Sequence, residues 1–376
     1  MSVDVLPRYE AATLADVLPS LLHAAGAPLD RRPPAFALPG ARAAVLLLVD
    51  GLGHELLHAH AADAPVLAGL ADAGPLTVGF PSTTPISLTS LGTGLPPGAH
   101  GTLGLRFRVD GELLDALGWS AGGENLVERL VPERVQPEPT VLERAAAAGV
   151  AVTSVAPMEF RTSGLTRSGL RGGGYTGVAA LGDLMAGIVA GAQGPGPRLV
   201  YGYHADLDKM GHLYGPGSPA WRWQLRQLDT LVAMLAEALP SGTLLAVTGD
   251  HGMVTVDRTV DADRSPELQA GVALLGGDPR ARHVYTEPGA AADVLAAWRS
   301  VLGEDAWILP RDEAVAAGWF GPVHDRVRDR IGDVVVALRG TAAVLRTEAE
   351  PWLSRFPGQH GSFTGAEQLV PLLVRS

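Results

Sequence analysis

The segment AAVLLLVD, residues 43–50, contains seven consecutive apolar residues followed by an aspartate. A short run that is apolar throughout is typical of a strand buried on both faces, as in a parallel sheet. It is far too short to span a bilayer. We therefore expect an α/β fold in which Asp50 lies at the carboxyl end of a central strand.

Strands and helices alternate along the first two thirds of the chain. Residues 141–157, VLERAAAAGVAVTSVAP, combine a helix, a glycine stop and a second strand. Residues 198–208, RLVYGYHADLD, and residues 242–252, GTLLAVTGDHG, predict two further strands. Apolar residues at helical spacing predict an amphipathic helix over residues 220–239. This alternation indicates a mostly parallel sheet covered by helices on both faces.

The composition of the 376 residues limits the function classes. The net charge is −11 and no basic block occurs, which argues against a protein that coats nucleic acid. The absence of cysteine excludes disulfides, thiolate metal sites and cysteine nucleophiles. Because the N-terminal segment lacks a basic region followed by an apolar stretch, we expect no signal peptide, no membrane segment and a cytoplasmic protein. The sequence does not indicate an oligomeric state.

The character of the sequence changes over residues 256–354, which are rich in Arg, Asp and Pro. A helix is expected over residues 290–302, and a pair of strands over residues 332–347, GDVVVALRGTAAVLRT. We interpret this part as an inserted α+β subdomain. The expected core then consists of residues 1–255 and 355–376.

Three aspartates lie where predicted strands end, namely Asp50, Asp208 and Asp250. In open α/β sheets, ligands bind outside the carboxyl ends of the strands. Three carboxylates that converge there repel one another and need cations to be tolerated. The sequence therefore predicts a cation site at this edge of the sheet.

Histidines complete this pattern. His212 follows Asp208 by four residues in DKMGH, so the two side chains share one face if a helical turn follows the strand. His251 directly follows Asp250, and His360 lies in the glycine-flanked loop GQHGS. Carboxylate and imidazole ligands suit Zn²⁺ or Mn²⁺. Six such ligands are enough for two ions, and two ions about 4 Å apart clamp the attacking and leaving oxygens of a phosphoryl displacement.

The segment FPSTTPISLTSLGTG, residues 80–94, contains seven hydroxyl side chains. Such a run is either a helix cap with small packing residues behind it or the presentation of one nucleophile. We expect a helix with Thr84 as its N-cap and Pro85 as its first residue. A hydroxyl beside a bound ion and a helix N-terminus is activated and close to a phosphate-binding position. This favours Thr84 as the nucleophile, with Thr83 or Ser82 as the alternative if the register differs.

Five segments together resemble the alkaline phosphatase superfamily, most closely the nucleotide pyrophosphatase/phosphodiesterase (type I phosphodiesterase) family. They are VDGLG, FPSTTPISLTSLGTGLPPGAHG, DLDKMGHLYGPGS, TGDHGM and GQHGS, in family order over nearly the whole chain. The resemblance implies a three-layer α/β/α sandwich with a mostly parallel central sheet and a smaller inserted subdomain. It also implies Zn²⁺ and hydrolysis of phosphodiester or pyrophosphate bonds in nucleotide-like or other small phosphoesters through a covalent phospho-threonine.

The family pattern also implies which residues hold each ion. The implied ligands of one ion are Asp50, Asp250, His251 and Thr84, and those of the other are Asp208, His212 and His360.

The chain departs from the family pattern at one position. Three residues past the nucleophile the family usually has Asn, whereas this chain has Ser87, whose hydroxyl can still donate to phosphate.

Other residues are candidates for contact with the substrate. Lys209, the single lysine of the chain, can contact a phosphate or a leaving group. Trp119 can stack on a substrate and Arg161 can pair with its phosphate. For all three residues, a surface or packing role is the alternative. His54, His58 and His60 are expected to be surface or packing histidines. A phosphonate hydrolase, a phosphomonoesterase or a phosphomutase of the same superfamily is the alternative function.

Overall fold

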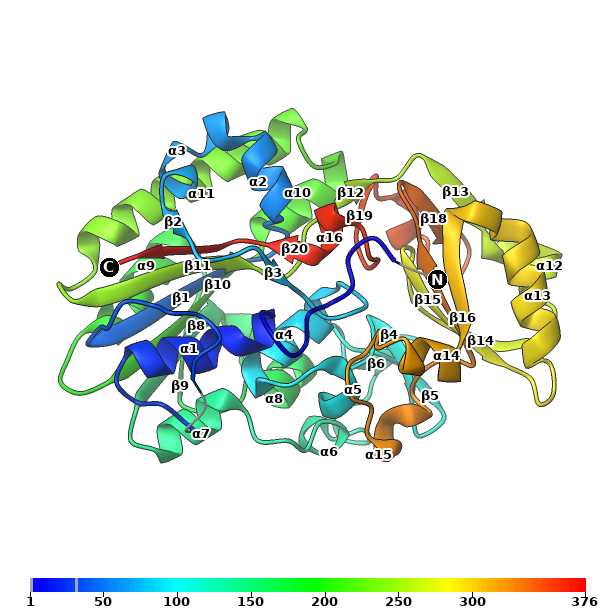
Figure 1. Cartoon of the computed structure of the whole chain (residues 1–376), viewed down its shortest axis with the longest axis horizontal. Coiled ribbons are helices and arrows are strands. Elements are labelled where there is room, and N and C mark those ends of the chain that lie inside the picture. Colours follow the sequence, from blue (N-terminus) through cyan, green and yellow to red (C-terminus); the bar gives the residue numbers. More distant parts are fainter. Residues whose placement is uncertain (1–2, 31–32) are drawn as a thin grey trace.

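The computed structural model of the chain describes residues 3–30 and 33–376. Its centre is a seven-stranded sheet whose order is β2-β21-β11-β1-β10-β8-β9 (Figure 1). Neighbouring strands from β11 to β9 are parallel, and β21 is antiparallel to both β11 and β2. The strands are β2 (Ala71–Asp72), β21 (Leu372–Arg375), β11 (Thr243–Gly249), β1 (Ala43–Val49), β10 (Arg198–His204), β8 (Ala151–Pro157) and β9 (Gly174–Val178).

Strand β1 is buried along its whole length, as its apolar run predicts. Successive side chains of a strand point to opposite faces, so Leu46 and Leu48 pack in one cluster while Leu47 and Val49 pack in another. Figure 1 shows the two layers of helices that cover these faces. One layer includes α1 (Val17–Ala24), α4 (Thr84–Thr93) and α7 (Val141–Ala147), and the other includes α2 (His54–Ala59), α10 (Asp206–Tyr214) and α11 (Pro219–Ala238). The expected α/β/α sandwich is confirmed.

Two four-stranded sheets lie beside the central one. The first has the order β14-β15-β17-β16 and packs against α13 (Ala291–Leu302). The second has the order β4-β5-β6-β7. Their strands are β14 (Val272–Asp278), β15 (Ala281–Thr286), β17 (Val334–Leu338), β16 (Ala306–Pro310), β4 (Arg106–Val109), β5 (Glu112–Asp115), β6 (Ser120–Ala121) and β7 (Glu124–Asn125).

The two strands expected over residues 332–347 exist, but they do not pair with each other. Strand β17 lies between β15 and β16. Strand β18 (Ala342–Leu345) instead runs parallel to β13 (Arg258–Asp261). The connection between β17 and β18 therefore leads from one sheet to another. The division of the chain into a core and an inserted subdomain stays a prediction.

The structure can be compared with the expected absence of a membrane segment only over the helices that it describes. Within residues 3–30 and 33–376, none of them is both long enough and apolar enough to cross a bilayer.

A buried ion pair connects the start of β15 to the C-terminal segment that contains the GQHGS loop. The side chains of Arg280 and Glu367 are both fully buried. Arg280 Nε donates to Glu367 Oε1 at 3.0 Å, and Arg280 Nη2 donates to Oε2 at 2.7 Å. Glu367 also accepts from the Ser362 amide at 3.0 Å and from the Thr364 hydroxyl at 2.6 Å. This carboxylate therefore fixes the chain on the C-terminal side of His360.

Replacement of Glu367 by glutamine is expected to destabilise the protein strongly. Glu367→Gln leaves the buried Arg280 charge without a counter-charge, and breaking one side of such a pair costs roughly 3–5 kcal/mol of unfolding free energy. Urea unfolding followed by tryptophan fluorescence measures the loss. The control is Asp312→Asn, because Asp312 pairs with Arg328 but has a side chain that is 80% exposed, and exposed pairs contribute at most about 1 kcal/mol. Equal losses in both variants would contradict this account.

Candidate active site

The predicted ligands meet at the carboxyl ends of three neighbouring strands. Asp50 follows β1 and Asp250 follows β11, and these strands pair in parallel. Strand β10, on the other side of β1, leads into α10. Our expectation that this strand continues to Asp208 is wrong, because β10 ends at His204 and Asp208 lies in the first turn of α10. Acidic residues favour the first turn of a helix, and His212 then follows one turn later on the same face.

His360 reaches the site through a short strand pair. Strand β19 (Gly358–Gln359) pairs with β12 (Val254–Thr255), which follows His251 closely in the chain. The rings of His251 and His360 are stacked, with centroids 3.5 Å apart and an interplanar angle of 15°. The pairing therefore joins two segments that are far apart in the sequence at one point of the site.

The three site histidines have the same orientation. In each ring Nδ1 contacts a backbone carbonyl, and because a carbonyl only accepts, Nδ1 carries the hydrogen. Burial lowers the pKa of His360 well below its usual value, which favours the neutral ring. A neutral ring protonated at Nδ1 has a lone pair at Nε2. The bonds run from His212 to Gly358 O (2.8 Å), from His251 to Gly252 O (3.0 Å) and from His360 to Ser82 O (2.9 Å).

These Nε2 lone pairs face carboxylates and one another. His251 Nε2 lies 3.4 Å from Asp50 Oδ1 and 3.5 Å from Asp250 Oδ2. His212 Nε2 lies 3.4 Å from Asp208 Oδ2 and 3.2 Å from His360 Nε2. A lone pair that faces an anion or another lone pair is unfavourable unless a cation lies between them. With neutral rings, the arrangement therefore suits a cation that these atoms could hold together.

The aspartates give the same indication. Asp50 Oδ1, Asp208 Oδ1 and Asp250 Oδ2 are buried and have no hydrogen-bond partner. Burial, together with the charges of Asp250 and Asp208, raises the pKa of Asp50 well above its usual range, and burial also raises the pKa of Asp250. Tyr203 donates a hydrogen bond to the other Asp50 oxygen. Unpartnered carboxylate oxygens next to bare imidazole nitrogens fit divalent cations that accept oxygen and nitrogen ligands.

Two groups of ligand atoms lie close enough to hold an ion. Their atoms are within 4.8 Å of one another in each group, and Asp208 belongs to both. Asp250 falls outside these groups, although its Oδ2 lies near His251 Nε2. The groups are Asp208, His212 and His360, and Asp50, Asp208 and His251.

Thr84 lies at the start of α4 and faces this cluster. Its hydroxyl oxygen is 3.2 Å from His251 Nε2, and because that nitrogen is bare, the hydroxyl donates. The helix begins at Thr84 and its N-cap is Thr83, so our expectation of Thr84 as the cap is wrong by one residue. Proline is tolerated anywhere in the first helical turn, and Pro85 alone therefore does not fix the start. The Thr84 hydroxyl remains free of any capping bond.

The neighbouring hydroxyls are engaged inside the fold. Ser82 donates to Ser362 O at 3.0 Å, and Thr89 donates to Pro85 O at 2.6 Å. Ser87 is fully buried and donates to Asp250 O at 2.6 Å. Its hydroxyl therefore holds the backbone of a predicted ligand instead of facing a substrate.

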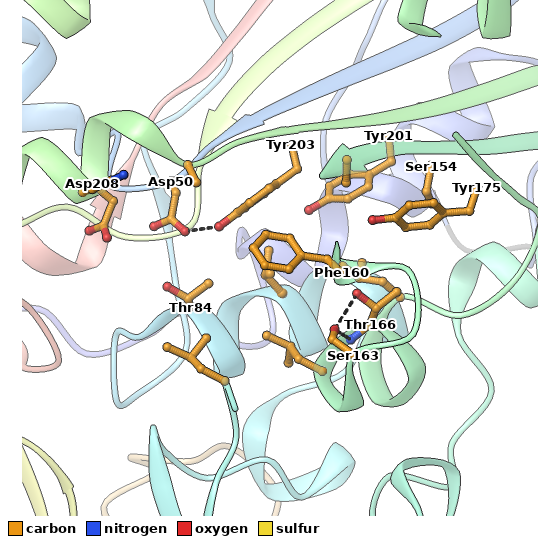
Figure 2. A pocket seen from close by; sticks show the side chains of 17 residues that line it. Asp50, Thr84, Ser154, Phe160, Ser163, Thr166, Tyr175, Tyr201, Tyr203 and Asp208 are labelled. Atoms are coloured by element: carbon orange, nitrogen blue, oxygen red, sulfur yellow. Dashed lines mark hydrogen bonds between the residues drawn. The ribbon is translucent and has the colours of Figure 1, made fainter. Parts of the chain in front are cut away.

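A cavity of about 380 Å³ opens beside Thr84 (Figure 2). Its floor is the sheet, where Tyr175, Ser154 and Tyr201 lie side by side on β9, β8 and β10. Tyr203, two residues beyond Tyr201, lies between this row and Asp50. The opposite wall comes from α4, from α8 (Gly164–Gly169) and from the segments next to α8. Its side chains include Leu88, Phe160, Leu165, Thr166 and Leu170.

Of three further residues predicted to contact the substrate, one lines the cavity and two do not. Lys209 lines the cavity and is exposed. Trp119 is 1% exposed, donates from Nε1 to Leu130 O at 2.7 Å, and is not among the lining residues. Arg161 is exposed and also lies outside the lining.

The sequence reasoning missed the tyrosines of the cavity floor. In YGYH the two tyrosines are two residues apart on a strand and therefore share a face. That spacing places Tyr201 and Tyr203 together, but only the register of β10 on β1 brings Tyr203 to Asp50.

Comparison with known proteins agrees with this architecture. Residues 44–363 match the family model of type I phosphodiesterase/nucleotide pyrophosphatase. Phosphopentomutase from Anaeromyxobacter dehalogenans is 31% identical over 172 residues, which cover 44% of this chain and 42% of that protein. The chain spans less than half the length of the curated relatives that it matches.

Two solved structures share the fold. One is an inactive murine ectonucleotide pyrophosphatase/phosphodiesterase 5 in complex with AMP, with a TM-score of 0.67, 18% identity, and coverage of 88% of this chain and 87% of that one. The other is phosphonoacetate hydrolase from Sinorhizobium meliloti in complex with phosphonoformate, with a TM-score of 0.67, 20% identity, and coverage of 90% and 92%. The two structures show a shared fold, and the family model over residues 44–363 shows that the chain belongs to the type I phosphodiesterase/nucleotide pyrophosphatase family.

Proposed function

We propose that this chain hydrolyses phosphodiester or pyrophosphate bonds of small organic phosphoesters, nucleotide-like ones included, with Thr84 as the nucleophile. One observation carries the proposal. The free hydroxyl of Thr84 lies 3.2 Å from His251 Nε2, next to buried carboxylate oxygens that have no partner. Family membership supports the reaction class, and the local geometry supports the choice of Thr84.

The donor set favours two divalent ions, Zn²⁺ first and Mn²⁺ as the alternative. Such ions, when bound, neutralise the carboxylates, hold the phosphate and lower the pKa of a neighbouring hydroxyl. Asp208 is common to both ligand groups, so its carboxylate could hold either ion. The proposed ligands are Asp50, Thr84, Asp208, His212, Asp250, His251 and His360.

Thr84 performs the displacement in this proposal. Its hydroxyl gives its proton to solvent, Oγ1 forms a bond to phosphorus, and the bond from phosphorus to the leaving oxygen breaks. The leaving oxygen takes a proton from solvent. Water then adds its oxygen to phosphorus, the bond from phosphorus to Oγ1 breaks, Oγ1 regains a proton and the phosphate product leaves. Backbone N–H groups in the first turn of α4 have no partner inside the helix, and the helix dipole is positive at this end. Both features favour a phosphate next to Thr84.

The cavity suggests which organic group the substrate contains. Its charged lining residues are Asp50, Asp208 and Lys209, of which the two aspartates lie at the Thr84 end in Figure 2. The remainder of the wall is largely aliphatic and aromatic. Away from the aspartates, Ser154 Oγ and the Tyr201 hydroxyl are buried without a hydrogen-bond partner. We therefore propose an uncharged, mostly apolar group with a polar atom that these two hydroxyls bind.

A phosphonate hydrolase, a phosphomonoesterase or a phosphomutase is the alternative function. The fold shared with phosphonoacetate hydrolase and the partial similarity to phosphopentomutase favour keeping it. Release of the same phenol from a diester and from a monoester, release of phosphate from a phosphonate, and phosphoryl transfer within a sugar phosphate separate these activities, and the diester is expected to be fastest.

Removal of the Thr84 hydroxyl is expected to abolish turnover. Thr84→Val keeps the shape but deletes the nucleophile, and the loss of a nucleophile lowers kcat by on the order of 10³-fold or more. Release of 4-nitrophenol from a phosphodiester measures kcat. An acid-quenched reaction should also contain the peptide with Thr84 joined to the phosphoryl group and to the ester substituent that did not leave, seen by mass spectrometry.

The matched control is Thr83→Val, which removes the adjacent hydroxyl with the same change of shape. It is expected to keep most of the activity. If Thr83→Val were inactive and Thr84→Val active, the nucleophile would be one residue away from the proposed position.

Activity is expected to depend on divalent metal. Dialysis against a chelator should abolish turnover, and Zn²⁺ or Mn²⁺ should restore it, with metal content measured by mass spectrometry. Asp208→Asn should lower both turnover and metal content, because one carboxylate serves both ligand groups. Asp206→Asn is the control, since Asp206 is exposed on the same helix and belongs to neither group. Full activity of the chelated protein would refute the metal requirement.

Substrate choice is expected to follow the cavity. Among 4-nitrophenyl diesters, a phenyl ester with a neutral amide substituent should exceed both the methyl ester and the carboxylate-substituted phenyl ester in kcat/KM. Ser154→Ala combined with Tyr201→Phe should lower kcat/KM roughly tenfold or more for the amide ester, because each lost hydrogen bond is worth about 1 kcal/mol. The methyl ester should be unaffected. Equal effects on both esters would indicate a structural role for the two hydroxyls.

A further inference from the structure

A third group of side chains that could hold a metal ion lies outside the cavity beside Thr84. His54 and His58 are one turn apart on α2, and Asp72 is on the edge strand β2. One ligand atom from each lies within 4.8 Å of the others. None of the three residues lines the cavity or belongs to the proposed catalytic ligands. The group therefore needs an explanation of its own.

The contacts within this group have the spacing of ligands around one ion. His54 Nε2 lies 3.0 Å from His58 Nε2 and 3.3 Å from Asp72 Oδ2. The two imidazole rings meet edge to face, with centroids 4.3 Å apart. Ligand atoms about 2.0–2.1 Å from a tetrahedral zinc ion are separated from one another by roughly 3.3 Å. The two separations from His54 Nε2 are close to this edge length, and the ligand atoms of His58 and Asp72 lie within 4.8 Å of each other.

Hydrogen bonding alone does not satisfy the group well. His54 Nε2 has a single in-plane position, which is either an N–H or a lone pair. As a lone pair it accepts from His58 but faces the Asp72 carboxylate; as an N–H it reaches both partners only through two bent, shared bonds. A cation among the three atoms satisfies all of them at once. Burial and the neighbouring His58 lower the pKa of His54, which favours its neutral, ligating form.

Asp72 is held in position for this role. Its Oδ1 accepts from the Gly74 amide at 2.8 Å and from the Leu372 amide at 3.2 Å. The other oxygen, Oδ2, is the one that faces His54. Hydrogen bonds that orient a ligating carboxylate in this way are typical of metal sites. His58 and Asp72 are exposed and His54 is partly exposed, so an ion reaches the group directly from solvent.

We propose that His54, His58 and Asp72 bind one divalent transition-metal ion, with water completing its coordination. Two imidazoles and one carboxylate suit Zn²⁺. The ion fastens α2, which begins four residues after Asp50, to β2 and through Asp72 to the backbone of β21. Its role is structural, because its ligands join α2 to the edge strand of the central sheet. The proposal does not depend on the reaction at Thr84.

Zinc content measured on the full chain tests the proposal. Protein equilibrated with a buffered low concentration of Zn²⁺ and then desalted is analysed by mass spectrometry. His58→Gln should lose about one zinc per chain and keep its phosphodiesterase turnover. His60→Gln, the same substitution two residues along the chain, should lose none.

A second comparison separates this ion from those proposed at Thr84. Asp208→Asn and the double variant Asp208→Asn/His58→Gln should differ by about one zinc. Zn²⁺ should also raise the melting temperature of Asp208→Asn by a few degrees more than that of the double variant, because binding to the folded state stabilises it. Equal zinc content and equal shifts would overturn the proposal and leave an ordinary His–Asp contact.

Discussion

The repulsion among three carboxylates at one edge of a sheet is the constraint on which this site depends. Asp50, Asp208 and Asp250 each keep a buried oxygen without a partner, and three imidazole nitrogens face them as lone pairs. A change of histidine tautomer does not remove this conflict, because backbone carbonyls already hold the Nδ1 hydrogens. Positive charge between the side chains removes it. The same positive charge would also attract a phosphate. The clustered carboxylates repel one another without cations, and with cations they suit the site to phosphoryl transfer.

The frame must hold these groups together against that repulsion. Parallel pairing of β1 with both β10 and β11 sets the spacing of the strand ends. Gly51 lets the turn after Asp50 approach α10: its φ is +75°, and a Cβ there would lie 2.9 Å from Asp208 Cα. On the far side, the Arg280–Glu367 pair fixes the segment that follows His360. Backbone close approach and one buried ion pair therefore position the site, and neither touches the reacting atoms.

The sequence predicts those parts of this arrangement that are local. The apolar run before Asp50 and the strand–helix alternation indicate the sandwich, because burial on two faces leaves a pattern within seven residues. Contacts that join distant segments leave no such pattern. The pairing of Arg280 with Glu367 spans 87 residues, and the contact of Tyr203 with Asp50 depends on strand register.

Residue type alone also does not show whether a side chain faces a substrate or the core. The ring of Trp119 suits stacking on a substrate, but it is packed inside the fold with its N–H bonded to the Leu130 carbonyl. His54 and His58 could be paired by their helical spacing, but Asp72 could not be added to them before the fold was known.

Strand β10 connects the chemistry of the site to its selectivity. Tyr203 donates to one oxygen of Asp50, which leaves the other oxygen free to face His251, and its ring also forms part of the cavity wall. Two residues earlier on the same face, Tyr201 extends that wall beside Ser154. A group that fills the cavity therefore contacts the side chain that orients a proposed metal ligand. Under the proposed function, selectivity would come from how well the organic group packs along the sheet, because the ions held around Thr84 would bind only the phosphate.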